Sequence, residues 1–326
     1  MEPKKRSNIP RLLFWMSLIV VIALGIFKQQ DIFDWYTLRG YTPPAALQNI
    51  ATETTMNAEG RKLFFVNKPA LQEKAAFYKS CEEGETTIVL GCYKPNDGIF
   101  VLNVTDARLE GIMQVTSAHE MLHVAYERLS SREKKTINAE LDRVYNTLNN
   151  PQLTEKIGVY KNSGADIHNE LHSILGTEVV NLSPVLEAHY KKYFINRAQV
   201  TALSAKYQAV FQERRDTLTR YDADLVRLEG LVKTNNAILD TDQASITAEN
   251  GRLDALLKAD RIEEYNAAVP AYNARVSEFK SLLSQTKQYV IDYKTTLDAR
   301  NQVALEAQEL NKALDSRIDT VVESKF

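Results

Sequence analysis

Apolar residues recur at helical spacing over much of the chain, and the longest such pattern occupies residues 198–326. Two runs of leucine, valine, isoleucine and tyrosine, at alternating steps of three and four, predict two helical arms of near-equal length. Ala259-Asp260 lies between the arms and is the expected bend, and Pro270 is expected to kink the second arm. The pattern predicts an antiparallel coiled-coil hairpin. Pairing of the arms between two chains is the alternative.

Upstream of this hairpin, helical spacing alternates with short apolar runs. The runs at residues 62–66, 86–93 and 98–104 are rich in β-branched and aromatic residues, and they predict strands. Pro95-Asn96-Asp97-Gly98 predicts the turn that joins the last two strands. We therefore expect a mainly α fold with a small antiparallel β-sheet, followed by the long coiled-coil hairpin.

One predicted helix carries the most specific motif of the chain, His119-Glu120-Met121-Leu122-His123. The chain has only five histidines, so a chance match is improbable. Histidines four residues apart lie on one helix face and can reach one metal ion, while Glu120 lies on a neighbouring face. The motif predicts His119 and His123 as ligands of Zn²⁺ and Glu120 as a general base. The helix is predicted to bury an apolar stripe, formed by Val115, Ala118, Leu122, Ala125 and Leu129.

A catalytic zinc ion usually takes a third protein ligand, and a helix predicted over residues 166–176 offers candidates. Glu170 borders the apolar face of that helix and is the first choice. Glu178 would lie on that face only if the helix continues through Gly176, and His172 points to the far side. A group that polarises the substrate carbonyl is also expected. The candidates for it are Tyr126, Tyr190, Tyr193 and His189. Tyr126 lies three residues past His123 on the same helix face, and support of that ligand is its alternative role.

Together with Asn169-Glu170 on the later helix, the His119-Glu120-Met121-Leu122-His123 motif resembles the gluzincin class of zinc metallopeptidases. The resemblance covers roughly residues 60–195 and implies an α+β zincin-like domain over residues 56–197. It also implies that His119, His123 and Glu170 hold the zinc ion and that Glu120 is the general base. The chain departs from thermolysin-like members, which have an aspartate four residues after the glutamate ligand, because Ile174 stands there.

The N-terminus has the pattern of a membrane-targeting segment. A basic leader, residues 1–11, precedes a nearly unbroken apolar run, residues 12–27. The pattern predicts a cytoplasmic leader, a single transmembrane anchor and a linker over residues 28–55, with the following domains extracytoplasmic. A cleaved signal peptide is the alternative.

Cys81 and Cys92 are the only cysteines of the chain. They flank a predicted turn and strand, and in an oxidising compartment they are expected to form one disulfide. Two free thiols are the alternative.

Composition narrows the possible functions. The formal net charge is −2 and the isoelectric point is about 6.3, which argues against a nucleic-acid-binding protein. Only 12 glycines and 9 prolines favour a helix-rich protein. The expected partners are a polypeptide substrate, the membrane, and either a protein partner or a second copy of the chain bound through the coiled coil.

These features predict a membrane-anchored, extracytoplasmic zinc metallopeptidase. The edge of the sheet is expected either to pair with an extended substrate peptide or only to cover the zinc helix. A cell-envelope scaffold or adaptor with a structural or vestigial zinc site is the alternative function. Hydrolysis of a non-peptide envelope component is a third hypothesis, which differs from the first only in substrate.

Overall fold

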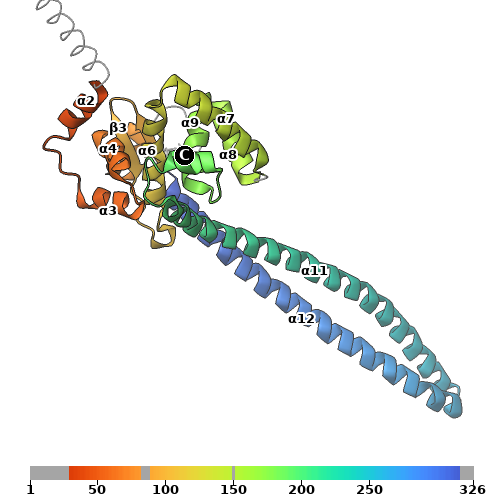
Figure 1. Ribbon diagram of the computed structural model, residues 1–326. Helices are drawn as coiled ribbons and strands as arrows, with labels where there is room; N and C mark the ends of the chain where they lie inside the picture. The colour runs from red at the N-terminus through yellow and green to blue at the C-terminus, as the bar shows by residue number, and fades with distance from the viewer. Residues whose placement is uncertain (1–28, 82–88, 149–150, 316–326) are drawn as a thin grey trace, which may run out of the picture. The chain divides into compact units, whose positions relative to one another are not determined.

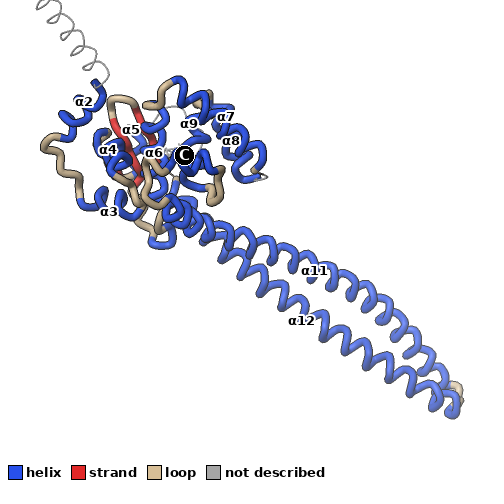
Figure 2. Tube along the Cα trace, in the orientation of Figure 1, coloured by secondary structure: helices blue, strands red, loops and turns tan. Residues whose placement is uncertain are grey.

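The computed structural model describes residues 29–81, 89–148 and 151–315. The chain divides into two compact units, Met1–Tyr207 with Leu314–Phe326, and Gln208–Ala313. Helices make up most of the described residues, and the one described sheet belongs to the first unit (Figures 1 and 2). The expected mainly α composition and the long helical hairpin are therefore confirmed.

The first unit is built around the helix that carries the histidine motif. This helix, α6, contacts α9, β2, β3, α3 and α4. The elements before α6 are α2 (Gln29–Leu38), α3 (Ala45–Glu53), α4 (Ala58–Val66), β1 (Ala70–Gln72), α5 (Lys74–Ser80), β2 (Gly91–Lys94), β3 (Gly98–Leu102) and the 3₁₀ helix η1 (Ala107–Leu109). Next come α6 (Ile112–Glu127), α7 (Ser131–Thr147), α8 (Pro151–Ser163), α9 (Ile167–Glu178) and α10 (Pro184–Tyr190).

The sheet has three strands in the order β1-β3-β2. β2 pairs with β3 in antiparallel fashion, as expected, with Cys92 opposite Phe100. β1 pairs with β3 in parallel, so the sheet is mixed and the prediction of a purely antiparallel sheet was wrong. β2 is an edge strand, and the first part of the strand predicted over residues 86–93 lies outside the described residues.

The residues predicted to form the first strand, 62–66, belong instead to helix α4. The side chain of Asn57 caps this helix by accepting hydrogen bonds from the backbone N–H groups of Glu59 and Gly60. Leu63, Phe64 and Val66 are all buried. A short continuous apolar run fits a buried helix as well as a strand, and here the cap and the surrounding core decide for the helix.

The apolar stripe predicted for α6 is buried at all five positions. Asp106 caps η1, where its side chain accepts a hydrogen bond from the backbone N–H of Arg108. α6 then begins at Ile112, after Gly111. The stripe is thus the buried face of α6, with Leu129 just beyond the end of the helix.

Residues 28–55, for which a linker is expected, contain α2 and α3. Leu47 and Ile50 of α3 are buried in the core of the first unit. Asp34 of α2 is buried and accepts hydrogen bonds from Arg128, with 2.6 Å between Oδ2 and Nη1. This segment therefore packs against the domain through the apolar residues of α3 and through the buried carboxylate of α2.

The predicted transmembrane segment, residues 12–27, lies outside the described residues. Among the described residues, none of the helices has the length and apolar character needed to cross a membrane. This finding contradicts the single-pass localisation expected from the sequence, and that localisation is not retained.

The second unit pairs most of α11 (Arg197–Lys258), from Gln208 onward, with α12 (Ile262–Leu314) up to Ala313. Arg300 binds Asp222 at 3.0 Å, and Asn235 Nδ2 donates to Thr286 Oγ1 at 3.1 Å, so the arms of one chain pair in antiparallel fashion. The reversal falls at the expected bend, where Asp260 has a φ of 59°. α12 continues through Pro270.

Candidate metal centre

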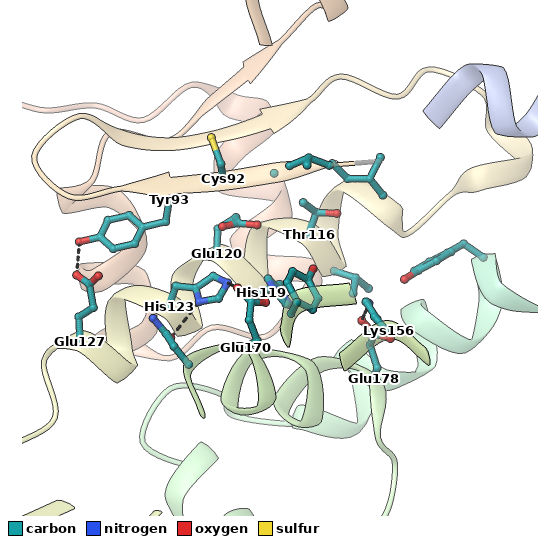
Figure 3. A pocket seen from close by; sticks show the side chains of 17 residues that line it. Cys92, Tyr93, Thr116, His119, Glu120, His123, Glu127, Lys156, Glu170 and Glu178 are labelled. Atoms are coloured by element: carbon teal, nitrogen blue, oxygen red, sulfur yellow. Dashed lines mark hydrogen bonds and ion pairs between the residues drawn. The ribbon is translucent and has the colours of Figure 1, made fainter. Parts of the chain in front are cut away.

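β2, α6, α8 and α9 line a cavity of about 290 Å³, together with Tyr207 of α11 (Figure 3). All of these residues belong to the first unit. The cavity brings His119, Glu120 and His123 of α6 together with Glu170 of α9. Glu178, the second candidate for the third ligand, lines it as well.

His119 and His123 lie one turn apart on the same face of α6, as histidines four residues apart must. Their ring centroids are 4.7 Å apart and the rings are nearly perpendicular, at 78°. One potential ligand atom from each of His119, Glu120 and His123 lies within 4.8 Å of the others. Local helix geometry alone therefore brings two imidazoles and one carboxylate together.

Glu170 reaches the two imidazoles from the first turn of α9. Its Oε2 lies 3.7 Å from Nε2 of His119, and its Oε1 lies 3.7 Å from Nε2 of His123. Both distances exceed those of hydrogen bonds. Two atoms bound to one tetrahedral zinc ion, at bond lengths of about 2.1 Å, are about 3.4 Å apart. The spacing therefore suits a shared ion better than direct contact.

Glu170 Oε2 is buried and has no hydrogen-bond partner among the described residues. A buried carboxylate oxygen without a partner costs free energy, which a bound cation would offset. Two imidazoles and one carboxylate are also the donor set that suits zinc. The residues of the cavity therefore fit a Zn²⁺ ion.

Asn169, next to Glu170, orients one of the two histidines. Its Oδ1 lies 3.0 Å from Nδ1 of His123. The amide oxygen can only accept, so Nδ1 carries the proton and Nε2 presents its lone pair toward Glu170. An acceptor at the far nitrogen of a metal-binding imidazole fixes the tautomer in this way. Ile174, at the position of the aspartate in thermolysin-like enzymes, is instead buried in the core.

The pKa values of His123 and Glu170 suit metal binding at pH 7. Burial and the neighbouring His119 together lower the pKa of His123 to about 4, so the imidazole is neutral at pH 7. Burial alone would raise the pKa of Glu170, but the two imidazoles outweigh burial and the net pKa is lowered. Burial likewise opposes the charge on His119, yet Glu170 and Glu120 raise its pKa overall.

The other two candidates for the third ligand have partners of their own. α9 does continue through Gly176, and Glu178 Oε1 lies 2.5 Å from Nζ of Lys156. His172 is fully buried, and its Nε2 lies 2.8 Å from Nε2 of His189. Gly176 allows α9 to lie close to α6, because a Cβ there would be 2.5 Å from Leu122 Cδ1.

The tyrosines predicted to polarise the carbonyl do not line the cavity. Tyr126 donates to Asn138 Oδ1 at 3.0 Å, and Tyr190 donates to the carbonyl oxygen of His172 at 2.7 Å. The ring of Tyr193 packs against His189, with 5.5 Å between the ring centroids. All three are buried, because they extend from faces of α6 and α10 and from a turn that pack into the core.

Sequence reasoning missed three other tyrosines, Tyr93, Tyr160 and Tyr207, which do line the cavity. Tyr93 follows directly after Cys92 on the predicted strand before the motif helix, so its position beside that helix was a usable signal. Its hydroxyl donates to Glu127 at 3.0 Å. Tyr160 and Tyr207 come from helices that meet the cavity only through tertiary packing.

Gly91 on β2 passes close to the motif. A Cβ at this position would lie 2.7 Å from Glu120 Oε1 and 2.5 Å from Thr116 Cγ2. A larger residue would displace the side chains of Glu120 and Thr116, so the absence of a side chain lets the backbone of the edge strand run directly beside Glu120. The adjacent Cys92 forms a disulfide with Cys81, which confirms the expected bond and ties β2 to the end of α5.

Comparison of the chain with protein-family models, with curated proteins and with solved structures found no match.

Proposed function

We propose that this protein is a zinc-dependent metallopeptidase in which His119, His123 and Glu170 hold the metal and Glu120 is the general base. One observation carries the proposal. Glu170 Oε2 is buried without a hydrogen-bond partner in the described part of the chain, and it faces the imidazole of His119 at 3.7 Å.

The positions of Glu170 and Glu120 indicate different roles for the two carboxylates. Glu170 comes from a second helix and lies against both imidazoles, so it suits the role of ligand. Glu120 is on α6 between the two histidines, beside the backbone of β2, where a substrate carbonyl would lie. A zinc ion in this cavity supplies Lewis-acid polarisation of the carbonyl oxygen and of an attacking water molecule. Glu120 accepts the proton of that water and later delivers it to the leaving amine.

The peptide nature of the substrate rests on β2. This strand is at the edge of the sheet, and Gly91, Cys92 and Tyr93 line the cavity beside Glu120. An extended peptide that adds to this edge presents its backbone carbonyls to the centre without any side-chain requirement. The sheet edge therefore favours a peptide substrate over a non-peptide one.

The test is metal content and hydrolysis measured on the purified full chain. We expect about one zinc ion per chain in the parent, and sharply weaker binding in His119→Ala and in Glu170→Gln. His168→Ala is the matched control, because His168 binds Asp142 on α7 and does not line the cavity. Absence of zinc from the folded parent after incubation with zinc would refute the proposed centre.

Activity is then tested with a library of quenched fluorescent peptides. We expect the parent to cleave a subset of the library and Glu120→Gln to bind zinc normally without cleaving it. If zinc binds at these residues but no peptide is cleaved, the scaffold with a structural zinc site is favoured instead.

A further inference from the structure

The cavity extends beyond the candidate metal centre to a lysine. Lys156 of α8 donates a hydrogen bond to Glu178 Oε1 at 2.5 Å. Glutamates 120, 127, 170 and 178 also line the cavity, and Lys156 is the one lysine or arginine among its described lining residues. A single cation in such an acidic cavity is a candidate for recognition of a negatively charged group.

Exposure shows which member of the ion pair is available to a ligand. The side chain of Lys156 is 39% exposed, whereas that of Glu178 is 17% exposed. An ammonium group has three N–H donors, and Glu178 Oε1 accepts one of them. The carboxylate thus holds the ammonium group in place, and the lysine is the member of the pair whose side chain is more exposed.

The charged side chains are ordered along β2. In Figure 3, Tyr93 and Glu127 lie at one end of the cavity, Glu120 and the two histidines lie in the middle, and Lys156 with Glu178 lies at the other end. The order follows the strand, because Gly91 is beside Glu120 and Tyr93 donates to Glu127. A peptide that pairs antiparallel to β2 would therefore have its N-terminal side near Glu127 and its C-terminal side near Lys156. In this direction the positively charged N-terminus of a peptide is on the side of Glu127, and the negatively charged C-terminus is on the side of Lys156.

We propose that Lys156 binds a carboxylate of the substrate on the C-terminal side of the scissile bond and thereby determines specificity. The inference rests on the proposed peptidase function. Two sources supply this chemistry, the C-terminal carboxylate of a short peptide and an aspartate or glutamate side chain. A charge-assisted hydrogen bond to lysine recognises either.

The test compares peptides that differ only in this carboxylate. One pair ends in a free acid or an amide, and a second pair, both amidated, carries glutamate or glutamine after the cleaved bond. We expect kcat/KM to be about tenfold or more higher for the carboxylate member of one pair, mainly through KM, as for a charged hydrogen bond. The responding pair identifies the source.

Four variants test the role of Lys156. In Lys156→Met the ratio of kcat/KM between the carboxylate peptide and its neutral counterpart is expected to fall to about one. In Lys156→Arg part of this preference should remain, because the positive charge is kept. Lys156→Met/Glu178→Gln removes the pair without leaving a carboxylate unpaired, and it should give the same loss if the single variant folds poorly. Lys161→Met, an exposed lysine on the same helix, is the control and should keep the preference.

Binding to Glu120→Gln separates this inference from the proposed function. Dissociation constants of the same peptides for this variant should show the same preference, and Lys156→Met in that background should abolish it. If the parent cleaves peptides without any carboxylate preference, or if the preference survives loss of Lys156, the inference is wrong while the peptidase stands. If no peptide is cleaved, the peptidase proposal fails, and the binding constants still decide whether Lys156 recognises a carboxylate.

Discussion

The first unit contains two pairs of histidines with nearly the same ring geometry and different surroundings. His119 and His123 have centroids 4.7 Å apart at 78°, and His172 and His189 have centroids 5.0 Å apart at 70°. The first pair opens on a cavity and faces Glu170. The second pair is buried and its Nε2 atoms are 2.8 Å apart, so each ring is the hydrogen-bond partner of the other. What distinguishes the candidate metal centre is therefore Glu170, which faces both imidazoles, whereas the imidazoles of the second pair bond to each other.

The largest effect is expected from replacement of Glu120, which lies between the two histidines of the first pair. Glu120→Gln keeps the shape of the side chain and removes the base, so peptide hydrolysis should fall by about 10²–10⁴-fold. Zinc content should stay near that of the parent. The measurement is kcat/KM on the best library peptide, with Glu110→Gln as an exposed control just before α6. Hydrolysis within a few-fold of the parent would remove Glu120 from the reaction.

Acid is expected to lower the stability of the protein through protonation of His189, a member of the second pair. Burial lowers the pKa of His189 from its ordinary 6.5 to about 4, so the folded state binds fewer protons than the unfolded state between these values. The stabilisation is complete above pH 6.5 and is lost as the pH falls toward 4, which amounts to about 3 kcal/mol. The measurement is the free energy of unfolding by urea across this range. The slope of this free energy against pH should decrease in His172→Leu/His189→Leu. An unchanged slope would show that His189 is not the source of the pH dependence.

Breaking the second pair should cost stability without removing zinc. His172→Leu leaves the buried Nε2 of His189 without its partner and should lower the free energy of unfolding by about 1–3 kcal/mol. The double variant His172→Leu/His189→Leu removes both polar groups and should recover part of the loss. Zinc content should remain that of the parent in both variants. A loss of zinc in a well-folded variant would show that the two pairs are not independent.

The smallest effect is expected from the acceptor that orients His123. Asn169→Ala removes the Oδ1 atom that lies 3.0 Å from His123 Nδ1, and zinc affinity should fall by about 10–100-fold. Competition with a zinc-binding dye measures this change. Asn146→Ala, an exposed asparagine on α7, is the control. Equal affinities in the two variants would mean that Asn169 does not support the ligand.

Several elements were predictable because the physical signal is local. The buried stripe of α6 follows from helical spacing, and the hairpin bend follows from the end of one apolar repeat and the start of the next. Within the apolar repeat of α11, the polar residue Asn235 is buried and binds Thr286 of the other arm. By contrast, residues 62–66 form a helix and residues 45–53 pack into the core, because neighbours distant in sequence decide how a short apolar segment is buried.

The same division applies to the candidate centre. The spacing of His119 and His123 within one helix determines by itself that both rings point the same way, because four residues make about one helical turn. Only the tertiary structure decided that Glu170 faces them, that Glu178 binds Lys156, and that Gly91 runs beside Glu120. These contacts join residues from different elements, and their geometry depends on how α8, α9 and β2 pack against α6. The tyrosines that line the cavity were not predicted for the same reason. The packing of whole helices, and not proximity in sequence, determines which side chains reach the cavity.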